Sequence, residues 1–503
     1  MSTKKKVLEN SLFYVVSSLL VRAIAFFLLP IYTYFLTPDD YGMVNLITSF
    51  IDVATFIIAF SLYSAAIRFY TDYKGDRTKL KRLYGTIISF VIISGIISLI
   101  IAIIFRNSVV SIFFDGIAFF PVVFLAFLFL IFLSLHTMHQ SILQGMQQGK
   151  KLTQLNLTVF TLTAALKILI IGYFKLGVLG YLLAQLIVYI AYFIYMVFDL
   201  KKYDMVEWTV DLPILKETLK YSIPLMPHNL STRIASWASR IFINSSGTRA
   251  DVGLYSIAMN FGNIIDVIQV AVNKAFQPWF FEMMSKNDEE SKKETVNLSY
   301  ALLVFYSFIY MGIGLFSQEV VILMTNKSYM LAWTVIPILV VGFSIKSMYY
   351  FYVNIIMFHK EATNKLFIAT IIGSLANIFL AYLLVPYYEM YGSAIAFVLA
   401  KIIITSIVIY MSRLYDDIGF SVIKMLCIIV PSLIFMVGGL YFSYTKCLTT
   451  FSLNNLFYKI LILVAYTLFV YLTNRKVIEK VYKSGLIQRM FRKEHRKNRH
   501  NGV

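Results

Sequence analysis

Apolar runs of about 20 residues, separated by short polar stretches, follow one another along the whole chain. An α-helix needs about 20 apolar residues to cross the hydrocarbon core of a bilayer. The pattern therefore predicts an all-α integral membrane protein with about 14 transmembrane helices. We expect these helices at residues 11–36, 43–67, 83–105, 117–138, 152–172, 177–199, 218–246, 252–278, 296–316, 331–358, 366–386, 391–411, 422–442 and 456–473.

Basic residues gather in alternate loops between these runs. If the N-terminus lies inside, the outside loops hold only Arg106, Lys175, Arg249, Lys327 and Lys446. Because Lys and Arg are retained in cytoplasmic loops, this asymmetry predicts a multi-pass protein with both termini in the cytoplasm. None of the outside loops is long enough for a folded domain, which argues against an extracytoplasmic polymerase.

The composition agrees with a membrane protein, since 59% of the residues are hydrophobic and 14% are charged. The net charge of +19 could indicate a nucleic-acid binder. However, most basic residues lie in the short loops and in a basic tail, so we expect no nucleic-acid partner. We expect that tail to lie against anionic lipid, with binding of a partner protein as the alternative.

Short motifs recur at a fixed separation along the chain. Arg22 recurs 211 residues later as Arg233, and "PDDYGMVNLITSF" matches "RADVGLYSIAMNF" in the same register. This repeat predicts two six-helix lobes that enter the membrane in the same direction and enclose a cleft, as in several transporters. The further matching pairs are Asp40 with Asp251, Gly42 with Gly253, Phe50 with Phe261 and, at a separation of 212, Gly180 with Gly392.

The repeat predicts a division of the chain into five parts. The first helices of the two lobes would line the cleft, so that Arg22 and Arg233 face each other across water. We expect an N-terminal six-helix lobe (1–199), a cytoplasmic linker (200–217), a C-terminal six-helix lobe (218–411), two extra transmembrane helices (412–473) and a basic cytoplasmic tail (474–503).

Several cationic side chains lie inside the predicted helices. On insertion scales, an Arg or Lys at the centre of a membrane helix costs roughly 2.5–3.5 kcal/mol of insertion free energy. We therefore expect the cations nearest the middle to face a water-filled substrate site, with a buried structural ion pair as the alternative. These are Arg22, Arg233, Lys346 and Lys401; Arg240, also assigned to the site, lies nearer a helix end with Lys167 and Lys274, where long side chains reach the interface.

Two acidic residues, Asp52 and Asp266, also lie deep in predicted helices. They are either ion-pair partners of the arginines or sites that couple transport to a proton or sodium gradient. The cations outnumber these acids, so the cavity is expected to bind an anion such as phosphate or pyrophosphate, which guanidinium groups contact in a bidentate manner. The expected polar lining includes Asn229, Asn263 and Asn273, which share helix faces with these charges.

No motif for covalent chemistry stands out. The stretch "GMQQGKK" lacks the glycine spacing and the Ser or Thr of a phosphate-binding loop. His136 and His139 have no third metal ligand nearby in the sequence. We therefore expect a transporter rather than an enzyme, with no metal and no cofactor apart from a coupling proton or sodium ion.

Four segments carry a resemblance to a known family: "LPIYTYFLTPDDYGMVNLI", "YSIPLMPHNLS", "DVGLYSIAMNFGNII" and "PYYEMYGSAIAFVLAKII". They resemble the polysaccharide flippases of the multidrug/oligosaccharidyl-lipid/polysaccharide exporter superfamily. The resemblance implies a MATE-like fold of twelve to fourteen helices in two lobes, with a cationic cavity. Many such flippases carry an acidic residue before the arginine of "SRIFI", where this chain has Ser239, so an ion pair of Arg240 is in doubt.

The resemblance also implies a function. Such proteins move undecaprenyl-pyrophosphate-linked oligosaccharide repeat units of O-antigen, capsule or exopolysaccharide across the bacterial plasma membrane by alternating access. Polysaccharide polymerase and glycosyltransferases are then the expected partners, besides the bilayer and the lipid-linked substrate. The alternatives are a lipid II flippase, a drug or cation exporter of the same fold and, as an enzyme, a polysaccharide polymerase.

Overall fold

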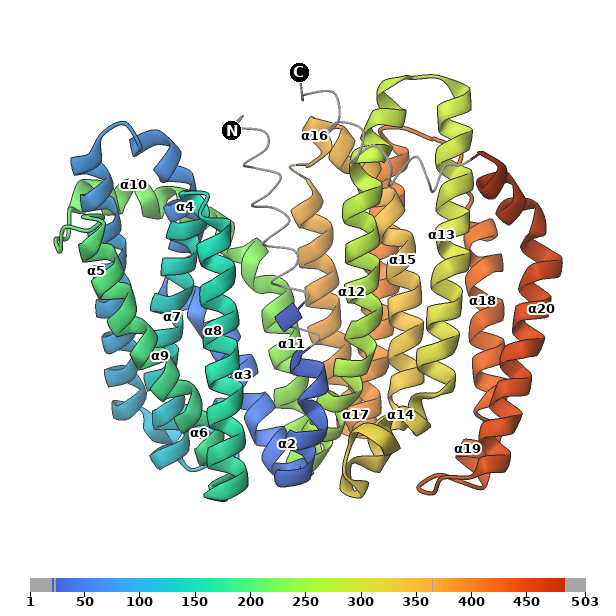
Figure 1. Cartoon of the computed structure of the whole chain (residues 1–503), viewed down its shortest axis with the longest axis horizontal. Coiled ribbons are helices and arrows are strands. Elements are labelled where there is room, and N and C mark those ends of the chain that lie inside the picture. Colours follow the sequence, from blue (N-terminus) through green and yellow to red (C-terminus); the bar gives the residue numbers. More distant parts are fainter. Residues whose placement is uncertain (1–19, 22–23, 364, 485–503) are drawn as a thin grey trace. The chain divides into compact units, whose positions relative to one another are not determined.

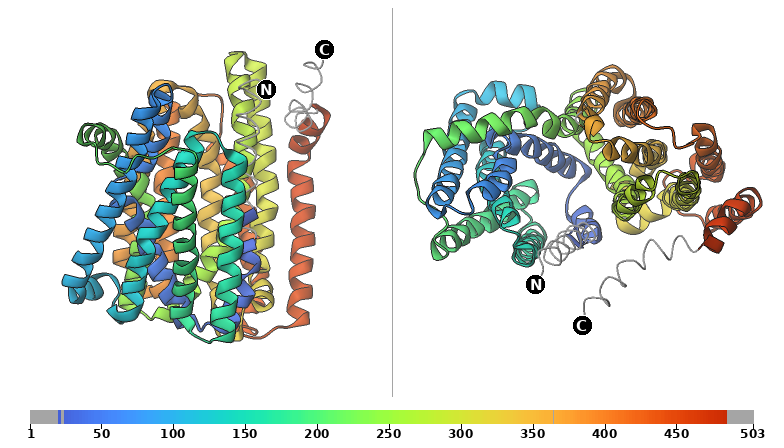
Figure 2. Two further views of the ribbon diagram at one scale, coloured as in Figure 1. Left: turned by 60° about the vertical axis from the view of Figure 1, so that its left-hand side comes forward. Right: turned by 90° about the horizontal axis from the view of Figure 1, so that it is seen from above.

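The computed structural model describes residues 20–21, 24–363 and 365–484, and all regular elements among them are helical (Figure 1). Eleven of these helices are long and apolar enough to cross a membrane. Most long helices of each unit run roughly alongside one another, as the right-hand view in Figure 2 shows. The predicted class, an all-α membrane protein, is confirmed.

The chain folds as two compact units, an N-terminal unit, Met1–Gly253, and a C-terminal unit, Leu254–Val503. The helices that begin in the N-terminal unit are α2 (Leu29–Phe35), α3 (Pro38–Ile58), α4 (Leu62–Tyr73), α5 (Arg77–Ile104), α6 (Arg106–Phe113), α7 (Phe124–Gly145), α8 (Gly149–Ile168), α9 (Gly177–Lys202), α10 (Leu212–Ser222), α11 (Met226–Ser246) and α12 (Arg249–Ser285). Short π- or 3₁₀-helical turns, Phe119–Val123, Leu169–Tyr173 and Ile223–Leu225, adjoin α7, α8 and α11.

Most of α12 belongs to the C-terminal unit. That unit continues with α13 (Glu289–Leu315), α14 (Ser317–Met324), the 3₁₀ segment Lys327–Thr334, α15 (Ile336–Phe358), α16 (Lys360–Thr363), α17 (Leu366–Arg413), α18 (Val422–Gly439), α19 (Tyr441–Thr445) and α20 (Leu453–Ser484). Helices α18 and α20 both pack on α13. The two helices expected beyond the repeat therefore join the C-terminal unit.

The fourteen predicted membrane helices outnumber the eleven apolar helices by three. The runs 366–386 and 391–411 form one element, α17, in which Glu389 has a non-helical backbone (φ 48°, ψ −127°). Helix α11 forms where 218–246 was expected, but its many polar residues keep it outside the apolar set. The first run is described only from residue 20 and contains the short apolar helix Ile24–Phe35. The number fourteen stays a prediction.

The predicted linker 200–217 is partly helical. Helix α9 extends to Lys202, and α10 begins after Asp211, whose carboxylate accepts the backbone N–H of Ile214. Helix α10 packs against α4 and α5 with Ile214 and Thr218 buried. Helix α11 packs on α3, so both helices belong to the N-terminal unit. The boundary between the two units therefore lies further along the chain than the lobe boundary expected from the repeat.

The two recurring motifs have the same local structure. Thr37 accepts a hydrogen bond from the backbone N–H of Asp40, whose carboxylate accepts the backbone N–H of Thr37 in return. Thr248 and Asp251 form the same reciprocal pair before α12. Each motif is therefore a capping box that begins a helix.

Gly42 and Gly253 lie where backbones approach closely. A Cβ atom on Gly42 would lie 1.8 Å from the carbonyl oxygen of Arg249, and one on Gly253 would lie 2.2 Å from that of Pro38. Pro38 and Arg249 are themselves matching positions of the repeat. Only glycine fits at either place, and the matched close approaches agree with the repeat locally. The repeat of six whole helices stays a prediction.

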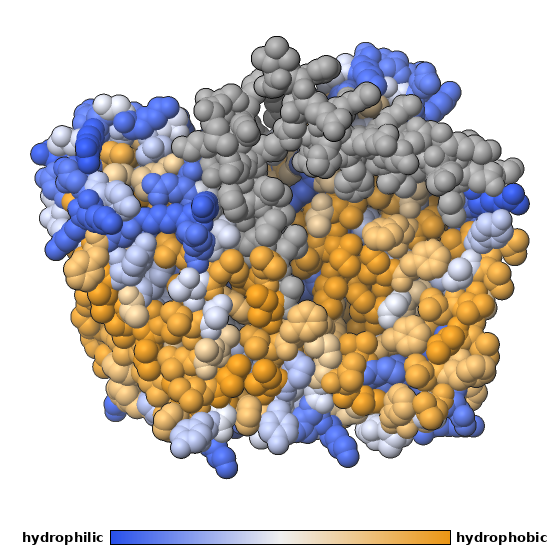
Figure 3. All heavy atoms as spheres, in the orientation of Figure 1, coloured by the Kyte–Doolittle hydropathy of each residue, from blue (hydrophilic) through white to orange (hydrophobic). Residues whose placement is uncertain are grey.

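The side chains facing outward are those expected in lipid. In each unit the visible face is apolar along the middle of the helices and hydrophilic at their ends (Figure 3). On α5, Ile93, Ile97, Ile100 and Ile104 are all exposed. Exposed isoleucines along a helix of high mean hydropathy are typical of contact with lipid tails.

Candidate functional site

In the N-terminal unit, three charged residues come from two packed helices. Asp52 lies on α3, and Arg233 and Arg240 lie two turns apart on α11. Both arginines attract the Asp52 carboxylate electrostatically. The Arg233 guanidinium carbon lies 4.4 Å from the ring centroid of Phe56, one turn beyond Asp52 on α3.

The two arginines are held differently. Arg240 donates hydrogen bonds of 2.9 Å and 2.8 Å to the carbonyl and hydroxyl oxygens of Ser236. Among the described residues, neither Arg233 nor Asp52 has a hydrogen-bonded or ion-paired partner, and both side chains are exposed. Arg233 therefore keeps its donors available to a ligand, and these three charged side chains sum to one positive charge.

The expected position of Arg22 opposite Arg233 is not tested, because Arg22 lies outside the described residues. Asn229 lies half-buried on α11, one turn before Arg233. Asn263 is exposed on α12, one turn before Asp266. The roles of these residues stay predictions.

The C-terminal unit holds a second charged cluster. The Nζ atom of Lys346 on α15 lies 2.6 Å from Oδ1 of Asp266 on α12, and both side chains are about one-quarter exposed, at 21% and 26%. Tyr350, one turn beyond Lys346, donates to the same oxygen at 3.1 Å. Lys401 on α17 interacts electrostatically with both Lys346 and Asp266. Its Nζ lies 4.9 Å from the Phe397 ring centroid, and the cluster carries a net positive charge.

Polar contacts continue from this cluster along α12 and α15. Asn354 donates to the side-chain oxygen of Asn273 at 2.9 Å. Gln269, fully buried between Asp266 and Asn273, donates to Tyr310 and to the carbonyl oxygen of Phe343, both at 3.0 Å. The sequence pattern indicates Asp266, Asn273 and Lys346 but not the residues that hold them. The four-residue spacing of Lys346, Tyr350 and Asn354 is the signal that would have identified them.

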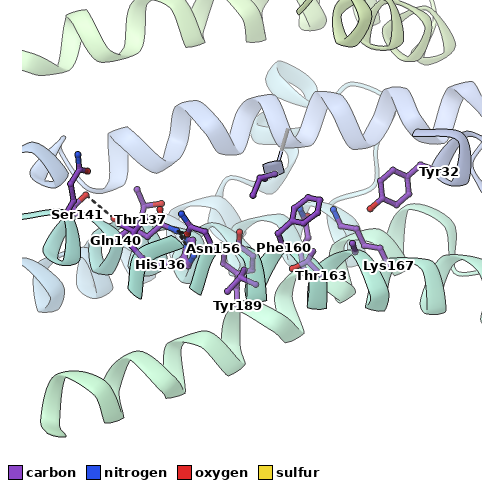
Figure 4. A pocket seen from close by; sticks show the side chains of 16 residues that line it. Tyr32, His136, Thr137, Gln140, Ser141, Asn156, Phe160, Thr163, Lys167 and Tyr189 are labelled. Atoms are coloured by element: carbon purple, nitrogen blue, oxygen red, sulfur yellow. Dashed lines mark hydrogen bonds between the residues drawn. The ribbon is translucent and has the colours of Figure 1, made fainter. Parts of the chain in front are cut away.

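A separate cavity of about 650 Å³ lies within the N-terminal unit (Figure 4). Helices α7, α8 and α9 line it, together with Tyr32 of α2. Lys167, only 6% exposed, contributes its ammonium group to the lining. No sequence pattern indicated this cavity, because most of its polar residues are neutral. Its polar lining is His136, Thr137, Gln140, Ser141, Gln144, Asn156, Thr163, Lys167, Gln185, Tyr189 and Tyr32.

A buried ionic cluster lies beside this cavity. The Nδ1 atom of His139 is 2.8 Å from the hydroxyl of Tyr192, and its Nε2 is 3.4 Å from Asp199. The ammonium group of Lys151 lies 2.6 Å from Asp199, which also accepts a hydrogen bond from Tyr195. These contacts tie α7, α8 and α9 together and give His139 a structural role in the described part of the chain.

A family profile described as polysaccharide biosynthesis protein matches residues 7–284, more than half of the chain. The chain belongs to the polysaccharide biosynthesis protein family. The matched residues include α3, α11 and most of α12, which carry Asp52, Arg233, Arg240 and Asp266. The predicted resemblance is therefore confirmed at the level of the family.

One curated protein that is similar to this chain is a Haemophilus influenzae protein named for the Lsg locus. The two are 24% identical over 288 residues, which cover 56% of this chain and 67% of the relative.

Solved structures share the fold at low sequence identity. The lipid II flippase MurJ, in an inward closed conformation, superposes with a TM-score of 0.69 at 16% identity, covering 93% of this chain and 99% of MurJ. An inward-facing MATE family multidrug transporter of the MOP superfamily superposes with a TM-score of 0.59 at 17% identity, covering 80% of this chain and 97% of that transporter. A MOP superfamily transporter from Pyrococcus furiosus superposes with a TM-score of 0.55 at 16% identity, covering 82% of this chain and 95% of that transporter. This polysaccharide biosynthesis protein therefore has the fold of membrane transporters, in agreement with the expectation of a transporter rather than an enzyme.

Proposed function

We propose that the protein is a flippase that moves undecaprenyl-pyrophosphate-linked oligosaccharide repeat units across the bacterial plasma membrane by alternating access. The observation that carries the proposal is the excess of cations over carboxylates at membrane depth in both units. Arg233 and Arg240 exceed Asp52 in one, and Lys346 and Lys401 exceed Asp266 in the other. An excess of this kind is costly in lipid but favourable beside a phosphorylated substrate.

The chemistry of the two clusters suits a pyrophosphate headgroup. The guanidinium of Arg233 replaces the water around a phosphate with paired donors, and the ammonium of Lys401 adds a point charge. The protein stabilises the headgroup inside the membrane, and the polyprenyl chain stays in lipid. No bond is made or broken, so the chain needs only to bind, release and change conformation.

Of the two acids, Asp52 is the better candidate for coupling to a proton or sodium gradient. Asp266 is engaged by Lys346 and Tyr350, so its charge is already compensated. Asp52 is exposed, and its neighbours Arg233 and Arg240 attract it without an ion pair. We expect a bound cation at Asp52 to change the attraction between α3 and α11.

The membrane setting follows from the same proposal. Both termini and the basic tail lie in the cytoplasm, where lipid-linked oligosaccharides are assembled. A glycosyltransferase then supplies the substrate and a polysaccharide polymerase consumes it on the far side.

Transport of lipid II is the second candidate function. The MurJ likeness over 93% of this chain favours it, and lipid II carries the same kind of pyrophosphate linkage. Export of cationic drugs is less favourable, because both clusters are positive.

Reconstitution into proteoliposomes tests the proposal. Translocation of a fluorescent polyprenyl-pyrophosphate oligosaccharide is compared with that of lipid II and of a cationic dye. We expect transport of the first, and its loss in the Lys401→Met variant. Transport of lipid II alone supports the second candidate, and transport of the dye alone would overturn both.

A further inference from the structure

The cavity in the N-terminal unit has its own polar lining, distinct from the two charged clusters. None of Asp52, Arg233 and Arg240 lines it. Its volume of about 650 Å³ lies within the range of small-molecule pockets, about 300–1,000 Å³. The cavity is therefore large enough for a ligand of its own.

The lining is built from matching polar faces of three helices. On α8, Asn156, Phe160, Thr163 and Lys167 follow one another at intervals of four, three and four residues, so they share one face. The polar lining residues of α7 recur at intervals of four, as do Gln185 and Tyr189 on α9. Figure 4 shows Tyr189 and labelled residues of α7 and α8 around the same cavity.

Three buried polar groups in this lining have no hydrogen-bonding or oppositely charged partner in the described part of the chain. The hydroxyl of Thr163 and the amide oxygen of Gln185 are buried with no hydrogen bond. The ammonium of Lys167 has neither a hydrogen-bond acceptor nor a carboxylate; its Nζ lies 3.5 Å from the Tyr181 ring centroid. Buried polar groups normally have partners, so these three indicate a ligand that supplies donors, acceptors and a negative charge.

Other groups of the lining are already held in place. The side-chain nitrogen of Gln140 hydrogen-bonds to Asn156 and lies 2.8 Å from Nε2 of His136. The His136 ring packs against Tyr189 and Tyr192, with centroids 4.9 Å and 4.4 Å away. Fixed amides and aromatic rings reduce the entropy that a ligand loses on binding.

We propose that this cavity binds an acidic sugar, a hexose ring bearing one carboxylate, of the lipid-linked oligosaccharide. Lys167 pairs with the carboxylate, Gln185, Thr163 and Asn156 bond the hydroxyl groups, and Phe160 and Tyr189 cover the ring faces. The inference rests on the proposed function, because it names the sugar that the flippase selects.

The lining favours a sugar over a second pyrophosphate site. Pyrophosphate carries several charges and is bound by clustered cations, whereas the described residues of the lining offer one ammonium group among neutral amides and hydroxyls. None of the described lining residues is acidic, so one negative charge on the ligand is balanced by Lys167. The single charge and the many hydrogen-bonding groups together match a monocarboxylated sugar.

The test measures binding to the full-length protein in lipid nanodiscs. The probes are glucuronate, glucose and inorganic pyrophosphate, and the variants are Lys167→Met, Lys167→Arg and Gln185→Leu. Lys274→Met is the matched control, since Lys274 lies within another helix and outside the cavity. We expect the wild type to bind glucuronate at least about tenfold more tightly than glucose, as one charged hydrogen bond provides.

Lys167→Met should remove this preference, Lys167→Arg should largely restore it, and Lys274→Met should leave it unchanged. Gln185→Leu should weaken the binding of both glucuronate and glucose. Equal binding of glucuronate and glucose by the wild type, or tighter binding of pyrophosphate that depends on Lys167, would overturn the proposal. So would a preference for glucuronate that survives in Lys167→Met.

Translocation separates this proposal from the proposed function. Lys167→Met should lose the preference for an acidic over a neutral lipid-linked oligosaccharide, whereas Lys274→Met should keep it. If the wild type translocates neither substrate, the proposed function fails, even where glucuronate binding stands. If it translocates both and Lys167→Met does not change their ratio, only the assignment of the cavity fails.

Discussion

The ammonium group of Lys346 lies 2.6 Å from the carboxylate of Asp266, which joins α15 to α12 across the C-terminal unit. Lys401 approaches the same pair from α17 and has no ion-pair partner of its own in the described chain. One carboxylate thus lies near two ammonium groups, so the cluster keeps a net positive charge. The pair therefore joins two helices of the unit and leaves one ammonium group without a carboxylate of its own.

Removing the carboxylate should destabilise the C-terminal unit. In Asp266→Asn, two nearby lysines lose their compensation, and breaking such a pair costs up to about 3 kcal/mol where it is partly exposed. We expect a lower thermal midpoint of the detergent-solubilised protein. The double variant Asp266→Asn/Lys346→Met should regain much of this loss. A single variant as stable as the wild type would show that the pair contributes nothing.

Arg233 should act on transport rather than on stability. Its guanidinium has no hydrogen-bonding partner among the described residues, so Arg233→Gln should leave the thermal midpoint nearly unchanged while translocation falls by more than about tenfold. Arg233→Lys should retain part of the activity, since it keeps the charge but loses the planar fork. Arg68→Gln, at an exposed pair with Asp72, is the matched control and should transport normally. A fall in stability equal to the fall in transport would instead assign Arg233 to the fold.

The close approach at Gly42 should tolerate no side chain. A Cβ atom there would lie 1.8 Å from a backbone oxygen, so Gly42→Ala must push α3 away from the first turn of α12, at a cost of about 1–3 kcal/mol. Thermal unfolding of purified protein measures this effect. Gly75→Ala is the control, because nothing lies within 4 Å of its added Cβ. Equal midpoints for the two variants would contradict the close approach.

Lys459 should anchor the last membrane helix. It is fully buried on α20, and its Nζ lies 2.8 Å from both carboxylate oxygens of Glu319 on α14. Glu319→Gln leaves a buried charge without its partner, so we expect a loss of about 3–5 kcal/mol, seen as earlier unfolding or increased proteolysis of α20. Unaltered protease resistance would argue that the pair is dispensable.

The sequence predicted the membrane class and the charged residues better than their surroundings. Apolar length identifies a membrane helix directly, and a charge within one is conspicuous, so Asp266 and Lys346 were both found. Their pairing depends on how α12 and α15 pack, which no local pattern encodes. Helix α11 was expected as part of the apolar run 218–246, although its polar residues set it apart from the apolar helices.

The cavity shows what sequence patterns miss. Gln140, Asn156 and Gln185 are neutral, and each is unremarkable within its own helix. Lys167 lies near a helix end, where the sequence suggested that it reaches the membrane surface, yet the fold buries it against Tyr181. Only the packing of α7, α8 and α9 brings these side chains to one space.

Recognition of a pyrophosphate headgroup by the cations at membrane depth is what the proposed function requires. Its most direct test is equilibrium binding, in nanodiscs, of a polyprenyl-pyrophosphate oligosaccharide and of the same glycan on an uncharged polyprenyl ether. We predict at least about tenfold tighter binding of the pyrophosphate form, lost in the double variant Arg233→Gln/Lys401→Met. Equal affinity for the two lipids, or a preference unchanged in the double variant, would contradict the account.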